Sequence, residues 1–247
     1  MFGKRVEKYM NKRAILGLLL AICLPLTGYY LVKYYSEKAV HMPRRYFYDS
    51  VAVIEKNGKT TTDTIWHRVK NMTFTNQLGK TVTLDSLKNK ILVIDFFFSR
   101  CPSICPGMAK SMKRLQDSYV NSKDSIVQFI SISIDPEHDS FPQLRKFANR
   151  FTNNHESWWF LTGNKKDIYD FALNELKASV ADVNVDTAFI HTEYFFLLDR
   201  ERVVRGWYNG FDTLKQAKLV GDIPLLMLEK RKKRSFKEFL DELFGRG

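Results

Sequence analysis

The feature that most constrains this chain is a strand-length apolar run, Ile91 to Phe98, that leads directly into a turn holding two cysteines. The run is rich in β-branched and aromatic residues, as in a strand that is buried on both faces of a sheet. Ser103 suits a helix N-cap and Pro106 suits a first helical turn, so we expect a helix to begin near Ser103. Cys101 and Cys105 would then lie at its positive N-terminal end, close enough to form a disulfide or to hold one metal ion.

Segments typical of strands and of helices alternate after this helix, which we expect to end near Tyr119. The patterns predict hairpins over 51–65 and 71–83, strands over 125–133, 158–161, 193–199 and 203–208, and helices over 141–151, 165–177 and 213–234. Strands interleaved with helices and followed by an antiparallel pair predict the α/β class: a thioredoxin-like mixed sheet flanked by helices.

Residues 14–32 contain no charged side chain and are long enough to cross a bilayer as one helix. Five basic residues precede them, which favours a cytoplasmic N-terminus and a C-terminal domain outside the cytoplasm. We expect a single-pass protein of a bacterial inner (cytoplasmic) membrane, with its C-terminal domain in the periplasm, because the leader leaves no room for a mitochondrial transit peptide. Two alternatives are a cleaved signal peptide, which lacks a small-residue cleavage site here, and lipid attachment at Cys23, where Ile22 is too bulky for a good lipobox.

The formal net charge is +12, but more than half of it lies in the two ends of the chain. A uniformly basic surface is therefore not indicated, and we expect no nucleic-acid partner. The tail carries a basic run, Lys230 to Arg234, and the pattern after it predicts a short amphipathic helix.

The two cysteines are more consistent with a functional site than with a structural disulfide. A disulfide between them would close a very short loop and gain little entropy, and α/β folds place ligand sites at the C-terminal ends of such strands. A thiol–disulfide oxidoreductase of this fold would have two residues between the cysteines, whereas this chain has three. It would also carry a proline just before the terminal strand pair, where this chain has His191 instead. Two thiolates with an imidazole suit copper, as Cu(I) or Cu(II), and a closed zinc site would need a fourth protein ligand.

Three stretches of the sequence resemble the signatures of one family. The stretch 98–106, with its C-x-x-x-C-P pattern, resembles the cysteine motif of the Sco/SenC family, and 131–139 and 161–163 resemble its second and third signatures. His191 stands where that family keeps a distal ligand. The resemblance implies a membrane-anchored, thioredoxin-like copper protein that helps to metallate the binuclear copper site of cytochrome c oxidase. It also implies that Cys101, Cys105 and His191 are the copper ligands.

We therefore predict a copper chaperone rather than an enzyme. Its expected partners are the copper-accepting subunit of cytochrome c oxidase, other periplasmic copper or thiol-redox proteins, and the membrane. The alternative is a thiol–disulfide oxidoreductase that keeps the oxidase's copper-ligand cysteines reduced. Cys101 and Cys105 would then cycle between the dithiol and the disulfide, and His191 would not be needed. A copper or redox sensor is a weaker third possibility. Asp135 is expected to cap or bridge a turn, or to contact a metal ligand without binding the metal itself.

These expectations divide the chain into five parts. They are a cytoplasmic basic leader over 1–13, a transmembrane helix over 14–32, a linker and hairpin over 33–70, a thioredoxin-like copper-binding domain over 71–229, and a basic amphipathic tail over 230–247.

Overall fold

The computed structural model describes residues 12–39, 41–56, 59–119, 126–178 and 193–229. The chain forms two compact units, one up to Met42 and one from Pro43 onward. The predicted helix in the tail lies outside the described residues.

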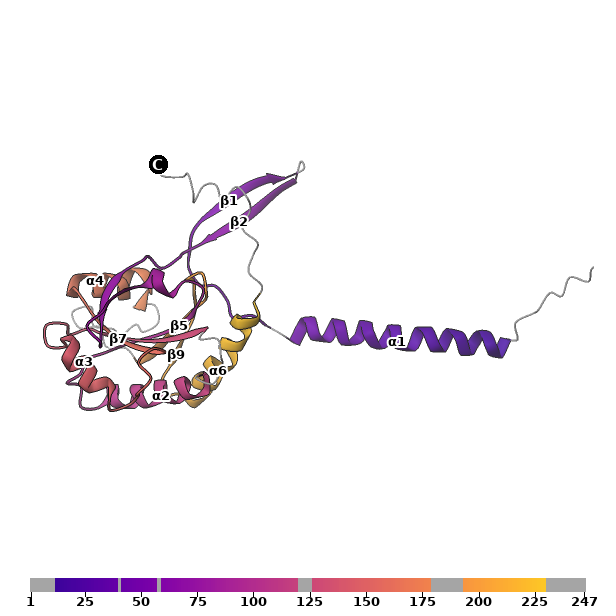
Figure 1. Ribbon diagram of the computed structural model, residues 1–247. Helices are drawn as coiled ribbons and strands as arrows, with labels where there is room; N and C mark the ends of the chain where they lie inside the picture. The colour runs from indigo at the N-terminus through magenta and orange to yellow at the C-terminus, as the bar shows by residue number, and fades with distance from the viewer. Residues whose placement is uncertain (1–11, 40, 57–58, 120–125, 179–192, 230–247) are drawn as a thin grey trace, which may run out of the picture. The chain divides into compact units, whose positions relative to one another are not determined.

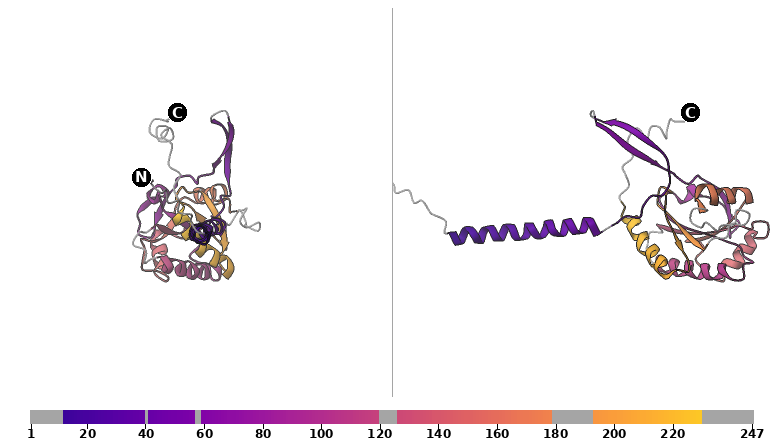
Figure 2. Two further views of the ribbon diagram at one scale, coloured as in Figure 1. Left: turned by 90° about the vertical axis from the view of Figure 1, so that its right-hand side faces the viewer. Right: turned by 180° about the vertical axis from the view of Figure 1, so that it is seen from behind.

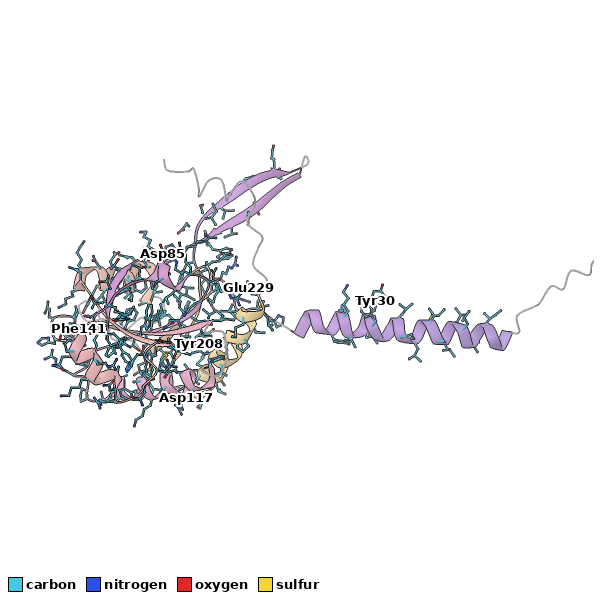
Figure 3. All side chains as sticks on the ribbon, viewed as in Figure 1. Tyr30, Asp85, Asp117, Phe141, Tyr208 and Glu229 are labelled. Atoms are coloured by element: carbon cyan, nitrogen blue, oxygen red, sulfur yellow. The ribbon has the colours of Figure 1, made fainter. Side chains whose placement is uncertain are left out.

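The first unit contains one long helix, α1 (Lys12–Ala39). Its window Ile15–Tyr35 has a mean hydropathy of 2.1. Side chains along the helix, Tyr30 among them, point outward from its axis (Figure 3). By length and composition α1 could cross a membrane, and it extends beyond the predicted 14–32 at both ends.

A seven-stranded mixed sheet lies at the centre of the second unit (Figure 1). Its strand order is β4-β3-β7-β6-β5-β8-β9. The strands are β3 (Thr73–Asn76), β4 (Thr81–Thr83), β5 (Ile91–Phe97), β6 (Val127–Ser133), β7 (Trp158–Thr162), β8 (Tyr194–Leu198) and β9 (Val204–Asn209). Strands β5, β6 and β7 run parallel, and the other pairings are antiparallel. The predicted α/β class and mixed sheet are confirmed.

Helices cover both faces of this sheet (Figures 1 and 2). One face packs against α2 (Ile104–Tyr119), α3 (Phe141–Ala148) and α6 (Thr213–Leu228). The other face packs against the short 3-10 helix η1 (Leu84–Leu87), α4 (Lys165–Asp170) and the π-helical turn η2 (Phe171–Glu175). Every residue of β5 is buried, because its side chains alternate between the two apolar cores.

The hairpin of β1 (Tyr48–Lys56) and β2 (Lys59–Trp66) forms a separate two-stranded sheet (Figure 2). Both predicted hairpins are therefore present. The predicted helix over 165–177 is shorter, because the chain changes from α4 to the π-helical turn at Phe171.

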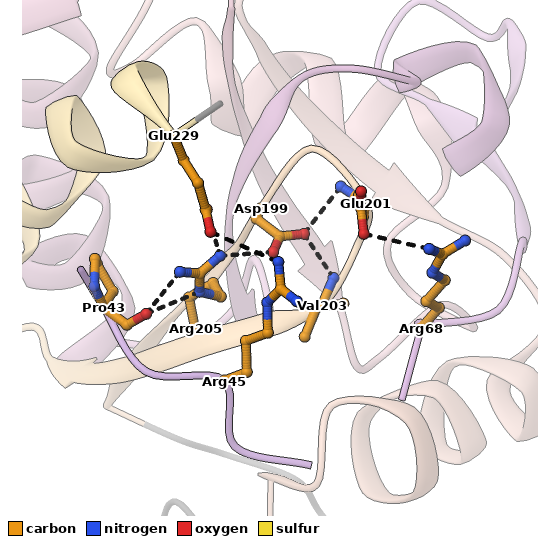
Figure 4. Close-up of polar contacts among 8 residues, drawn as sticks. All are labelled: Pro43, Arg45, Arg68, Asp199, Glu201, Val203, Arg205 and Glu229. Carbon is orange, nitrogen blue, oxygen red and sulfur yellow. Dashed lines mark hydrogen bonds and ion pairs between the residues drawn. The ribbon is translucent and has the colours of Figure 1, made fainter. Parts of the chain in front are cut away.

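The last described helix, α6, ends earlier than the sequence pattern predicts. Asp212 caps its N-terminus by accepting hydrogen bonds from the backbone N–H groups of the next turn. Glu229 has an extended backbone, so the helix stops at Leu228. The Glu229 carboxylate accepts a hydrogen bond from Arg205 at 2.6 Å (Figure 4). Figure 3 marks Glu229 at this end of α6.

Candidate functional site

The two cysteines lie close together at the connection between β5 and α2. Cys101 lies in the turn between these elements, and Cys105 lies in the first turn of α2. The backbone N–H of Cys105 donates a hydrogen bond to Cys101 Sγ at 3.3 Å, and both thiols are free. Both cysteines are buried, and Cys101, at 6% exposed, is more accessible than Cys105, at 1%.

The two thiols have opposite electrostatic environments. Burial alone would raise the pKa of the Cys101 thiol, but hydrogen bonds from the Cys105 backbone and thiol and from the N–H groups of Ser103 and Ile104 lower it below its usual value. Burial raises the pKa of the Cys105 thiol, and the neighbouring Cys101 and Asp95 raise it further. Cys101 is thus the thiol that ionises first.

A buried carboxylate, Asp139, holds the turn that carries Cys101. Asp139 is fully buried and accepts hydrogen bonds from the Ser99 backbone N–H at 3.0 Å, from the Ser99 hydroxyl, and from the Ser133 hydroxyl at 2.5 Å. It thereby ties the turn after β5 to the end of β6. No role was predicted for Asp139 from the sequence. The signal for one was a second carboxylate four residues after Asp135, at the end of an apolar strand.

Asp135 faces the same turn from the end of β6. Its carboxylate accepts a hydrogen bond from Arg100 at 2.7 Å and contacts His138 Nδ1 at 2.9 Å. Burial would raise the pKa of Asp135, but the hydrogen bonds and charges of His138 and Arg100 keep it below the usual value. Arg100 directly precedes Cys101, so Asp135 contacts the side chain of the residue next to that cysteine.

Another buried acid, Asp95, lies within β5. It is 2% exposed and accepts a hydrogen bond from the Ser131 hydroxyl at 2.5 Å, and Ser131 in turn accepts one from Trp158 Nε1 at 2.9 Å. Burial raises the pKa of Asp95 to about 7, although the Ser131 hydrogen bond opposes this. The negative charge of Asp95, when it is ionised, helps to raise the pKa of the Cys105 thiol.

The third predicted ligand, His191, lies outside the described residues. Within the part of the chain that the structure describes, no group of three or more histidine, cysteine, aspartate or glutamate side chains is arranged to hold a metal ion. The structure thus brings two of the predicted ligands together and leaves the placement of the third as a prediction.

Comparisons with known proteins give a consistent result. The SCO1/SenC family model matches residues 64–225. The "SCO1 protein homolog" of Bacillus subtilis (strain 168) is 35% identical over 167 residues, which cover 67% of this chain and 86% of that protein.

Solved structures agree with this match. A SCO1/SenC family lipoprotein from Bacillus anthracis str. Ames has 31% identity and a TM-score of 0.57, and the match covers 66% of this chain and 95% of that one. BsSco, a member of the Sco family of cytochrome c oxidase assembly proteins in which a disulfide switch was identified, has 34% identity and a TM-score of 0.56. The match with BsSco covers 68% of this chain and 98% of that one.

Proposed function

The chain belongs to the SCO1/SenC family, and from this premise we propose that it is a membrane-anchored chaperone that delivers copper to the binuclear copper site of cytochrome c oxidase. The family includes proteins of cytochrome c oxidase assembly. The observation that carries the proposal is the pair of free, adjoining thiols at the N-terminus of α2.

The donor set supports copper as the cargo. Cys101 and Cys105 would bind Cu(I) as thiolates, and His191 would complete the site and allow Cu(II) to bind. Yeast Sco1 has been crystallised with copper bound. Asp139 would fix the turn that presents Cys101, and Asp135 would position it through Arg100. Delivery would proceed by exchange of these ligands for the cysteines of the receiving subunit.

The helix α1 would be the membrane anchor. Its apolar window is long enough for one crossing, and the five basic residues before the window favour a cytoplasmic N-terminus. The copper site would then lie in the periplasm of a bacterial cell, where the receiving subunit and other copper or thiol-redox proteins could reach it. The relative from Bacillus anthracis is a lipoprotein, which is also a membrane-attached form.

A second candidate function is reduction of the oxidase's copper-ligand cysteines. It is favoured by the unequal thiols, since Cys101 is the more exposed and has the lowered pKa, while Cys105 is nearly inaccessible. BsSco, in which a disulfide switch was identified, is 34% identical. In this reaction Cys101 and Cys105 would lose two electrons and two protons to a partner's disulfide and form their own.

Substituting His191→Ala distinguishes the two functions. We expect the variant to lose or shift the thiolate-to-Cu(II) charge-transfer absorption of the full-length chain, because an imidazole ligand is removed while both thiolates remain. Absorption spectroscopy during copper titration measures this. An unchanged spectrum would exclude His191 from the site.

The same variant supplies the test of reductase activity. Metal-free protein is mixed with an oxidised fragment of the oxidase subunit, and the appearance of thiols is followed. Reduction at the same rate by wild type and His191→Ala would establish a dithiol reaction that does not use the histidine. Absence of reduction together with an altered copper spectrum would favour copper delivery. His155→Ala is a suitable control, because His155 contacts Gln77 and not the cysteine turn.

A further inference from the structure

A groove of about 710 Å³ lies along α2 and begins at Gly107, two residues after Cys105. Residues of α2, of the segment after α3 and of the connection between β9 and α6 line it. These helices cover one face of the sheet (Figure 1). Arg114, the α2 residue of the groove that is furthest from the cysteines, lies roughly 14 Å along the helix from Cys105. A protein segment bound in this groove would therefore lie beside the cysteine turn.

The charged side chains that line the groove are all cationic: Lys110, Lys113, Arg114 and Arg150. Lys113 pairs with Asp117 on the same helix. Within the described part of the chain, the other three form no ion pair with a carboxylate. Arg114 donates a hydrogen bond to the Ser111 hydroxyl at 3.1 Å, which leaves its charge uncompensated. The groove is thus a positively charged surface whose cations can pair with carboxylates from outside.

An exposed aromatic ring lies at the end of the groove nearest the cysteines. Phe211 is 48% exposed, and its ring lies directly on α2: a Cβ added at Gly107 would be 2.7 Å from Phe211 Cε1. The Ser111 hydroxyl donates a hydrogen bond to the carbonyl oxygen of Gly210 at 3.2 Å, which ties the connection between β9 and α6 to α2. The ring of Phe211 is therefore held in place while one side of it stays open to solvent.

We propose that this groove docks the protein that receives copper from Cys101 and Cys105, by binding an acidic surface segment of that protein that also carries an apolar side chain. The inference rests on the proposed function and names the chemistry by which the recipient is recognised. The partner's carboxylates would pair with Lys110 and Arg114, and its apolar side chain would pack on Phe211.

The position of the groove explains why such docking would serve copper delivery. Exchange of ligands requires the partner's cysteines to reach the sulfurs of this chain in a fixed orientation. Complementary charges around a contact speed up the encounter of two proteins and fix their register. A hollow with an aromatic ring fits a protein segment better than a lipid headgroup, for which exposed cations alone would suffice.

A photoreactive acidic peptide tests the docking surface without the oxidase. The probe has aspartate and glutamate residues around one benzoylphenylalanine, and it is irradiated with the full-length chain in nanodiscs of phosphatidylcholine. We expect mass spectrometry to find most crosslinks in 107–114 and 210–216. Crosslinks that are spread evenly over the chain, or that concentrate in Lys230–Arg234, would overturn the proposal. Labelling of the groove by a photoreactive phosphatidylglycerol, with no labelling by the peptide, would also overturn it.

Matched variants assign the crosslinks to the groove. Lys110→Gln with Arg114→Gln removes two exposed cations of α2 and should lower the crosslink yield roughly fivefold, since each exposed ion pair contributes modestly. The control Lys165→Gln with Lys166→Gln removes two cations at the start of α4, on the other face of the sheet, and should keep the wild-type yield. Equal yields from the two double variants would contradict the assignment.

Copper transfer to the copper-accepting fragment of the oxidase subunit separates this inference from the proposed function. The Lys110→Gln, Arg114→Gln variant should transfer Cu(I) roughly fivefold more slowly than the wild type at low salt, with its own Cu(I) affinity unchanged. The two rates should converge at about 0.5 M salt, because charge attraction is screened there. Equal rates at low salt would overturn the docking surface. A wild type that is crosslinked in the groove but passes no copper to the fragment would reject the proposed recipient, while the crosslinks would still support the groove.

Discussion

Replacing Cys105 with serine is expected to lower the affinity of the reduced chain for Cu(I) by more than roughly a hundredfold. Cys105 is 1% exposed and adjoins Cys101, so neither solvent nor another described thiol can take its place. A serine hydroxyl is a hard oxygen donor that Cu(I) binds poorly. Competition with a coloured Cu(I) chelator, under anaerobic reducing conditions, measures the change.

The third cysteine of the chain supplies the control for this experiment. Cys23 lies in α1, within the apolar window, and Cys23→Ser should leave the affinity unchanged. Cys101→Ser should behave like Cys105→Ser, since both thiolates are needed. A Cys105→Ser variant with wild-type Cu(I) affinity would contradict the two-thiolate site.

Replacing Asp139 with alanine is expected to destabilise the second unit by about 2–4 kcal/mol. The substitution leaves the partly buried Ser99 N–H and the buried Ser133 hydroxyl without their acceptor. At about 2–4 °C for each kcal/mol, the melting temperature should fall by roughly 5–15 °C. Thermal unfolding followed by circular dichroism measures this, and Asp139→Asn, which keeps one acceptor oxygen, should lose less.

The loss of Asp139 should also weaken copper binding, because the turn that carries Cys101 loses its attachment to β6. The matched control is Asp117→Ala, which removes a carboxylate whose side chain is 58% exposed and pairs with Lys113. That change should stay within about 0.5 kcal/mol. An Asp139→Ala variant as stable as Asp117→Ala would show that the buried hydrogen bonds do not hold the turn.

Much of the fold could be predicted because its signals are local. The apolar run of β5, interrupted only by Asp95, indicates burial on both faces, and its apolar residues do alternate between the two cores. Asn57-Gly58 marks a turn by itself, and the structure has the two strands that flank it, β1 and β2. The predicted end of α6 lies beyond the observed one at Leu228. The residue after this end, Glu229, contacts Arg205 of β9, a partner that the local sequence pattern does not show.

Part of the candidate site could also be predicted from local signals, and part could not. Cys101 and Cys105 could be placed together from their spacing, because they are four residues apart at the start of one helix, and the Cys105 N–H does contact Cys101 Sγ. The role of Asp139 could not be predicted, because its hydrogen-bond partner Ser99 is forty residues earlier in the sequence and lies close to it only in the folded protein. His191 was predicted as a ligand from its place in the stretch before the terminal strand pair and from the family resemblance. It lies outside the described residues, so its role stays a prediction.

The central claim is that this chain binds one copper ion through two sulfurs and one imidazole. X-ray absorption at the copper edge, on the full-length protein loaded with one equivalent of Cu(II), tests it most directly. The claim predicts two sulfur scatterers and one nitrogen scatterer from an imidazole in the first coordination sphere. A spectrum with only oxygen and nitrogen neighbours, or a protein that retains no copper after desalting, would contradict it.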